Sequence, residues 1–215
     1  MLDQNNRPSR WKVLDTRQRA KDRFIDLRTD KCRASNGDIV DYHVLSYPDW
    51  VNMVAFDKDC QLILVDEYRH GIGEAVVGLP GGALDKEANI SPEVAAKHGA
   101  ERELLEETGY AGSDAELLVK MMPNPAIQDN WAYTFFTFNA VQTHQQQFDV
   151  GNGEFCVTVK RDFVEVLQEI TENRADMQAM HIAALWSAAN YIAKSKDLPD
   201  EAQKLQQRVR QFLLG

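Results

Sequence analysis

The sequence predicts an α/β protein with a strand-rich first half and a helical end. Short runs rich in β-branched and aromatic residues, separated by turn-like segments such as SNGD, occupy the first half. Ser91 and Pro92 form an N-terminal helix signal, and Gly109 suits the left-handed position that follows a helix, so a helix is expected over 92–108. After residue 163 apolar residues recur at helical spacing. With 215 residues, one core is the simplest expectation.

The remaining elements follow from local patterns. Strands are expected at 24–28, 39–45, 51–56, 62–67, 115–121, 131–140 and 154–159. Apolar residues at i, i+3, i+4 and i+7 predict a helix from Phe163 to Ile170, and a second helical pattern covers 177–193. The last segment places its apolar residues on one face, which predicts an amphipathic helix that packs on the domain or, less commonly, on a partner.

Composition and charge exclude several classes of protein. Hydrophobic residues make up 44% and charged residues 27% of the chain, as in folded soluble proteins. A formal net charge of -9 argues against nucleic acid or an anionic membrane as a partner. The longest weakly polar stretch, 181–193, is too short for a membrane helix, and the first residues contain no apolar signal-peptide core. We therefore expect a cytoplasmic protein.

An acidic cluster is the most informative feature. In the segment RELLEETG, Glu103, Glu106 and Glu107 lie at i, i+3 and i+4, on one face of the expected helix. Carboxylate oxygens are hard ligands suited to Mg²⁺ or Mn²⁺, which take further ligands from substrate phosphates. Arg102 can fix Glu106, four residues on, by an ion pair. Taken alone, such a charge run is more often a solvated face than a metal site.

The wider context resembles the Nudix box, GX5EX7REUXEEXGU, whose second half is complete here. The matching residues are Gly81, Gly82, Arg102, Glu103, Leu104, Glu106, Glu107, Gly109 and Tyr110. Outside the box, VDEYRHG at 65–71 and PNPAI at 123–127 look like the ADP-ribose pyrophosphatase branch of that family. The resemblance covers roughly residues 11–192.

The resemblance implies a Nudix-type α/β/α sandwich with a mixed β-sheet, extra N-terminal strands and a C-terminal helical extension. It divides the chain into N-terminal strands at 1–50, a hydrolase domain at 51–195 and an amphipathic helix at 196–215. It also implies Mg²⁺-dependent hydrolysis, with Mn²⁺ as a substitute, at a metal site of Glu103, Glu106, Glu107 and Gly82. Gly81 and Gly82 would contact substrate, and relatives of this branch pair through N-terminal strands, so a homodimer is expected.

Some positions depart from the family pattern. Val94 stands where the box has its first glutamate, and Glu87 or Glu93 is the expected substitute. For Glu87, extra loop and about one extra helical turn would take up the excess residues before Arg102. Gly78 stands where many relatives have a glutamate before the proline-glycine loop. These departures affect the substrate more than the metal site.

Further candidates are single residues. Arg69 could bind a diphosphate with its guanidinium, or form a surface ion pair. Trp131 could stack on a base, although a tryptophan in WAYTFFTF is more often a core residue. Glu154, in a glycine-bearing loop, resembles the position that supplies a base or a further metal ligand, and Asp149 is the alternative. The histidines, His181 among them, suggest no role.

The sequence therefore predicts a Nudix pyrophosphatase acting on ADP-ribose or a nucleotide sugar, with catalysis by Arg102, the three helical glutamates and Glu154. The resemblance implies that water is the nucleophile, and the sequence shows no serine or cysteine nucleophile motif. One rival is a pyrophosphatase of nucleoside triphosphates or dinucleotides. Another, from a different class, is a nucleotide-binding protein that has lost catalysis, which the displaced first glutamate suggests.

Overall fold

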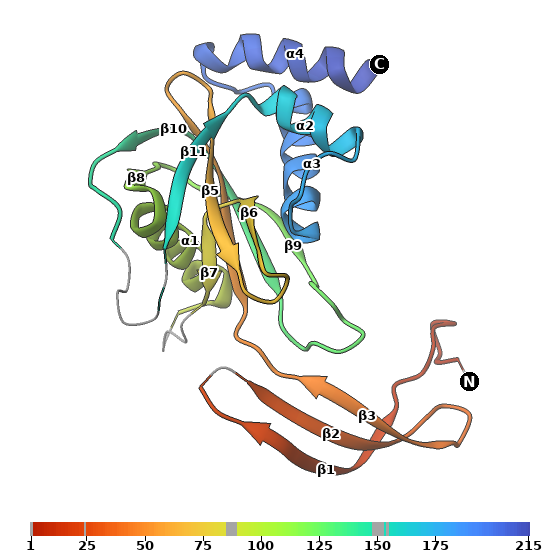
Figure 1. Cartoon of the computed structure of the whole chain (residues 1–215). Helices are drawn as coiled ribbons and strands as arrows, with labels where there is room; N and C mark the ends of the chain where they lie inside the picture. Colours follow the sequence, from red (N-terminus) through yellow and green to blue (C-terminus); the bar gives the residue numbers. More distant parts are fainter. Residues whose placement is uncertain (1, 24, 85–89, 148–152, 154) are drawn as a thin grey trace. The chain divides into compact units, whose positions relative to one another are not determined.

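The chain is divided between two units that alternate along the sequence, as a computed structural model shows for residues 2–23, 25–84, 90–147, 153 and 155–215 (Figure 1). One unit combines Met1–Pro48 with Met122–Trp131, and the other combines Asp49–Met121 with Ala132–Gly215. Both buried apolar clusters belong to the second unit. Chain length predicts one core, and the structure adds to it a separate sheet that a length argument does not foresee.

The first unit is a three-stranded antiparallel meander. Its strands, in the order β1-β2-β3, are β1 (Lys12–Lys21), β2 (Asp26–Arg33) and β3 (Ile39–Leu45). Strand β1 is absent from the sequence expectations, because it is exposed along its whole length and so has no alternation of buried apolar and exposed polar residues. Strand β2 begins two residues later than expected and runs further, to Arg33.

The segment Met122–Trp131 belongs to this unit through several contacts. The backbone N–H of Leu45 donates to the carbonyl of Ile127 at 2.7 Å, and Leu45 forms a parallel bridge with Gln128. The guanidinium of Arg28 donates to a carboxylate oxygen of Asp129 at 2.9 Å. These hydrogen bonds join two parts of the sequence that are far apart.

The second unit contains a mixed eight-stranded sheet. Its main strands follow the order β11-β5-β4-β10-β8, with β6 paired to β5, β7 to β4 and β9 to β10. Strands β4 and β10 are parallel, whereas the other pairs are antiparallel. The strands are β4 (Trp50–Asp57), β5 (Leu62–Arg69), β6 (Glu74–Gly78), β7 (Gly81–Ala83), β8 (Tyr110–Ala111), β9 (Glu116–Met121), β10 (Ala132–Gln142) and β11 (Cys156–Arg161).

Helices cover both faces of this sheet (Figure 1). Helix α1 (Pro92–Thr108) packs with alternate residues of β4 and β10 in one buried cluster. Helices α2 (Phe163–Thr171), α3 (Ala179–Lys194) and α4 (Gln203–Leu214) form the opposite cluster, and a short 3₁₀ turn (Asp200–Ala202) precedes α4. The expected α/β/α sandwich with extra N-terminal strands and a C-terminal helical extension is therefore confirmed.

The capped helix and the terminal helix also follow the sequence expectations. The hydroxyl of Ser91 accepts the N–H of Val94 at 3.3 Å, Pro92 opens α1, and Gly109 has φ 74°. In α4, Leu205 and Val209 are buried in the cluster with α2 and α3. The amphipathic face of α4 thus packs on its own unit. No helix in the described part of the chain is long and apolar enough to cross a bilayer.

Candidate active site

Helix α1 brings the predicted carboxylates to the glycine pair of β7. The Oε2 atom of Glu107 accepts the backbone N–H of Gly81 at 2.8 Å. A Cβ atom on Gly82 would lie 2.8 Å from Cδ and from Oε1 of Glu103. A Cβ on Gly81 would overlap the carbonyl oxygen of Val51, on the neighbouring strand β4. The two glycines are therefore needed because the helix carboxylates and β4 both approach their backbone closely.

Glu107 has an unusual protonation equilibrium. Burial raises the pKa of its carboxyl group from 4.5 to about 8, and the negative charges of Glu103 and Glu67 act in the same direction. The hydrogen bond from Gly81 and the charge of Arg69 oppose this rise in pKa. A carboxyl group that burial and neighbouring carboxylates keep protonated near neutral pH is a candidate functional group.

Arg102 supplies such a charge in the structure. One guanidinium nitrogen lies 2.6 Å from Oε2 of Glu106 and another lies 2.7 Å from Oε1 of Glu103. The sequence predicts that Arg102 fixes one carboxylate, and the structure shows it bound to two. Glu103 is well shielded, with 14% of its side chain exposed, whereas Glu106 is 41% exposed.

Carboxylate oxygens are suitable ligands for a hard divalent cation. In the structure, however, these three carboxylates bind Arg102 and the backbone of Gly81. Within the described part of the chain, no group of three or more His, Cys, Asp or Glu side chains is arranged as a metal site. Arg102 instead pairs with Glu103 and Glu106, while Glu107 accepts the N–H of Gly81. A cation bound there would compete with the guanidinium of Arg102 for Glu103 and Glu106, and with the proton for Glu107.

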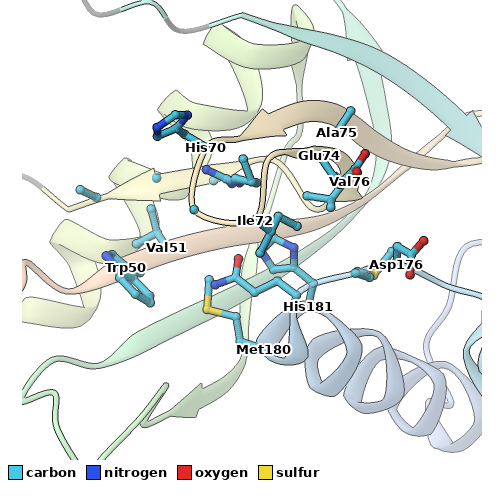
Figure 2. A pocket seen from close by; sticks show the side chains of 17 residues that line it. Trp50, Val51, His70, Ile72, Glu74, Ala75, Val76, Asp176, Met180 and His181 are labelled. Atoms are coloured by element: carbon cyan, nitrogen blue, oxygen red, sulfur yellow. The ribbon is translucent and has the colours of Figure 1, made fainter.

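A pocket of about 1050 Å³ opens beside the glycine pair (Figure 2). Gly81 and Gly82 line it together with Arg69, at the end of β5, and Trp50, at the start of β4. Its remaining walls are the 70–76 turn between β5 and β6 and the 176–181 segment that begins α3. The residues that contact the carboxylates therefore also form part of a cavity large enough for a nucleotide-sized ligand.

Several predicted site residues meet in this region. Arg69 lines the pocket and lies 2.9 Å from Oε2 of Glu67, with 46% of its side chain exposed. Arg69 thus forms a surface ion pair, as one prediction has it, and also lines the pocket in which the other prediction places a diphosphate. In the sequence, the only signal for this position of Arg69 is that it stands in the EYRHG run at a predicted strand end.

Other predicted residues lie elsewhere. Trp131 belongs to the first unit, is 38% exposed and is not among the residues that line the pocket. Glu93 is exposed in the first turn of α1. Glu87, Asp149 and Glu154 lie outside the described residues, so their predicted roles stay predictions.

Sequence reasoning missed two pocket residues. Trp50 is the aromatic side chain that lines the cavity, and nothing in its surroundings distinguished it from Trp131. His181 comes from the first turn of α3, more than seventy residues after the Nudix-like motif in the sequence. Only the fold brings it to the same cavity as Arg69.

The chain is similar to several known proteins. A family model described as the nucleoside diphosphate sugar hydrolase N-terminal domain matches residues 11–45. A methanol dehydrogenase activator of Bacillus methanolicus is 26% identical over 76% of this chain and 84% of its own. An ADP-ribose pyrophosphatase of Bacillus subtilis (strain 168) is 24% identical over 75% of this chain and 80% of its own.

Two further matches concern sequence and fold. An ADP-ribose pyrophosphatase of Mycobacterium tuberculosis (strain ATCC 25618 / H37Rv) is 35% identical over 48% of this chain and 47% of its own. The crystal structure of an ADP compounds hydrolase superposes with a TM-score of 0.70 at 20% identity, covering 86% of this chain and 95% of that one. The chain thus has the Nudix fold and, as its motif predicts, is similar to the ADP-ribose pyrophosphatases.

Proposed function

We propose that this protein is a divalent-metal-dependent pyrophosphatase that hydrolyses the diphosphate linkage of a nucleoside diphosphate joined to another moiety. ADP-ribose is the first substrate to test, and a nucleotide sugar is the next. The observation that carries this proposal is the glycine pair Gly81 and Gly82, which contacts two carboxylates of α1 and also lines a nucleotide-sized pocket. The similarity to two ADP-ribose pyrophosphatases supports it.

The metal ligands in this proposal are Glu103, Glu106, Glu107 and the carbonyl of Gly82. Mg²⁺ is the ion we expect, with Mn²⁺ as a substitute, because oxygen ligands suit both ions. A divalent ion bound there would neutralise part of the negative charge of the diphosphate and would lower the pKa of the attacking water.

The chain's own residues have distinct roles. The N–H of Gly81 orients the Glu107 carboxylate, and that carboxyl group must release its proton before it can bind a cation. In the metal-free chain Arg102 pairs with Glu103 and Glu106, so that its guanidinium screens their mutual repulsion until a cation binds. Arg69 lines the pocket and presents a guanidinium to the diphosphate, whose negative charge it partly neutralises.

A second carboxylate is proposed to come from outside α1. Glu154, or Asp149 as the alternative, would take a proton from the attacking water or bind a further metal ion. The chemical reason is that the three glutamates of α1 all approach from one helix face, so another group is needed on the far side of a bound diphosphate. Replacing each acid by its amide in turn tells the two apart.

A hydrolysis panel tests the function. Purified protein is incubated with ADP-ribose, nucleotide sugars, dinucleotides and nucleoside triphosphates, with Mg²⁺, with Mn²⁺ or with a chelator, and the products are separated. We expect AMP and ribose 5-phosphate from ADP-ribose only when metal is present. Glu107→Gln should lower kcat by orders of magnitude because a charged ligand is lost.

The matched control is Glu101→Gln, on the same helix but outside the glutamate cluster, where Glu101 faces Lys97 at 3.9 Å. This control should keep the wild-type rate. Near-normal turnover by Glu107→Gln would contradict the proposed site. Cleavage of nucleoside triphosphates in preference to ADP-ribose would support the rival pyrophosphatase, and binding without any turnover would support a nucleotide-binding protein.

We also propose a homodimer that pairs through the N-terminal strands. Strand β1 supports this, because it is exposed along its whole length and presents the apolar side chains of Val13 and Leu14. Exposed edge strands of this kind are suited to pairing with another chain.

A further inference from the structure

His181 is a buried histidine in the wall of the candidate substrate pocket. Only 4% of its surface is exposed, and it lies in the first turn of α3 (Figure 2). Its Nδ1 atom accepts the backbone N–H of Leu79 at 3.2 Å. Because a backbone N–H can only donate, the proton of the neutral ring lies on Nε2.

The backbone of β6 is shaped to receive this ring. A Cβ atom on Gly78 would lie 2.7 Å from Nδ1 and 2.9 Å from Cε1 of His181, so no other residue fits at position 78 while the ring is in place. Gly78 and Leu79 lead through Pro80 to Gly81 at the start of β7, whose backbone N–H donates to Glu107. The chain segment that holds the ring is therefore continuous with the one that orients the catalytic carboxylate.

The ring is neutral at physiological pH. Burial, together with the positive charge of Arg69, lowers the pKa of His181 from 6.5 to about 4. The acidic side chains that line the same pocket, Glu74 and Asp176, do not offset the effect of burial. His181 therefore offers a hydrogen-bond donor that carries no charge.

Among the described residues, the ring of His181 makes one hydrogen bond, through Nδ1, so Nε2–H has no protein acceptor there. Nε2 is not one of the buried side-chain atoms that lack a partner, and the ring lines the pocket, so we take Nε2–H to be reached from the pocket. Figure 2 shows the ring together with Ile72 and Met180, which also line the pocket. Ile72 has no hydrogen-bond acceptor in its side chain, and Met180 has only a weak one. Nε2–H is therefore available to a ligand atom in the pocket.

We propose that His181 is a substrate-recognition residue whose Nε2–H donates to an acceptor atom on the part of the substrate that fills the pocket. The proposal rests on the proposed pyrophosphatase function and adds to it a residue outside the Nudix-like motif. Since Nδ1 is already occupied by Leu79, the ring only donates. The group it binds is an oxygen or ring nitrogen with a free lone pair, and amino groups are excluded.

Two halves of ADP-ribose carry such acceptors, so both are used as probes. Binding of AMP and of ribose 5-phosphate is measured by calorimetry in buffer with chelator, for the wild type, His181→Asn and His181→Gln. The asparagine oxygen can replace Nδ1 as the acceptor for Leu79, but its side chain does not reach the position of Nε2. The glutamine amide places an N–H group close to that position.

We expect His181→Asn to weaken binding of one probe about threefold to tenfold, the range for one neutral hydrogen bond, and to leave the other probe unchanged. His181→Gln should recover part of the loss. With ADP-ribose as substrate, His181→Asn should raise KM and leave kcat near the wild-type value. His144→Asn, at an exposed histidine, is the matched control and should change neither measurement.

Three results would overturn the proposal: wild-type binding of both probes by His181→Asn, binding of neither probe by the wild type, or equal losses in both variants accompanied by a lower melting temperature. The last result would assign His181 a structural role only. The proposed function fails independently, if the wild type hydrolyses no nucleoside diphosphate derivative. The comparison of probe binding still decides the role of His181 in that case.

Discussion

The protonation of Glu107 predicts how the stability of the metal-free protein depends on pH. The carboxyl group titrates near pH 8 in the folded chain and near 4.5 in the unfolded chain. Between these values the folded chain keeps a proton that the unfolded chain has lost. Unfolding therefore releases a proton, and the free energy of unfolding falls as the pH rises.

The fall in the free energy of unfolding that Glu107 causes is clearest between pH 6.5 and pH 8. Below pH 6.5, His181 contributes in the opposite direction, because its pKa is 6.5 when unfolded and about 4 when folded. Between pH 6.5 and pH 8 the Glu107 contribution amounts to about 1.6 kcal/mol, and the remaining His181 contribution offsets about 0.4 kcal/mol of it. For a chain of this size the net loss of about 1.3 kcal/mol corresponds to about 3–5 °C in melting temperature.

Thermal and urea unfolding at pH 6.5, 7.25 and 8, with chelator present, would measure this effect. Glu107→Gln keeps an acceptor for Gly81 and removes the titration, so we expect it to lose less stability than the wild type over this range. At pH 8 it should be the more stable of the two proteins. Adding Mg²⁺ should stabilise the wild type and have little effect on Glu107→Gln, since the charged ligand is gone.

Glu101→Gln is the control, and its stability should follow the wild type across the range. Parallel curves for the wild type and Glu107→Gln would refute the reasoning, because they would mean that Glu107 titrates alike in the folded and unfolded chains. A Glu107→Gln protein less stable than the wild type at pH 8 would also refute it. Activity would then be lost for a structural reason.

Two other predictions concern the C-terminal helices and the N-terminal strands. Asp162 caps α2 by accepting the N–H groups of Val164 and Glu165 at 3.0 and 3.1 Å, and both of its carboxylate oxygens bind Arg208 of α4. Asp162→Ala should therefore lower the free energy of unfolding in urea by about 1–2 kcal/mol. An unchanged urea midpoint would show that neither contact stabilises the fold. Light scattering at micromolar concentration should give about twice the 24.4 kDa of one chain, and a monomer would exclude pairing through β1.

The parts of the fold that depend on local chemistry could be predicted from the sequence. Helix α1 is an example, because Ser91, Pro92 and Gly109 each act within a few residues of the chain. The central strands were also predictable, since their apolar runs are long. Strand β1 was not, because it is exposed along its whole length and its stability comes from pairing with β2.

The site was predictable only where its residues are close in sequence. Glu103, Glu106 and Glu107 are brought together by helical periodicity alone, which a sequence displays directly. The pocket depends on segments that only the fold brings together, so Trp50 and His181 gave no signal. The His181 ring fits only because Gly78 has no side chain, since a Cβ atom there would lie 2.7 Å from Nδ1 of the ring. This contact joins residues far apart in the sequence, so only the structure shows it.

The interleaved arrangement of the two units has a consequence for protein engineering. The chain passes from one unit to the other after Pro48, after Met121 and after Trp131. Removing the first 48 residues would leave 122–131 as a ten-residue stub without the backbone and side-chain partners that hold it. A minimal catalytic version of this protein must therefore also replace that stub with a short turn between β9 and β10, which are already antiparallel neighbours and could be joined as a hairpin.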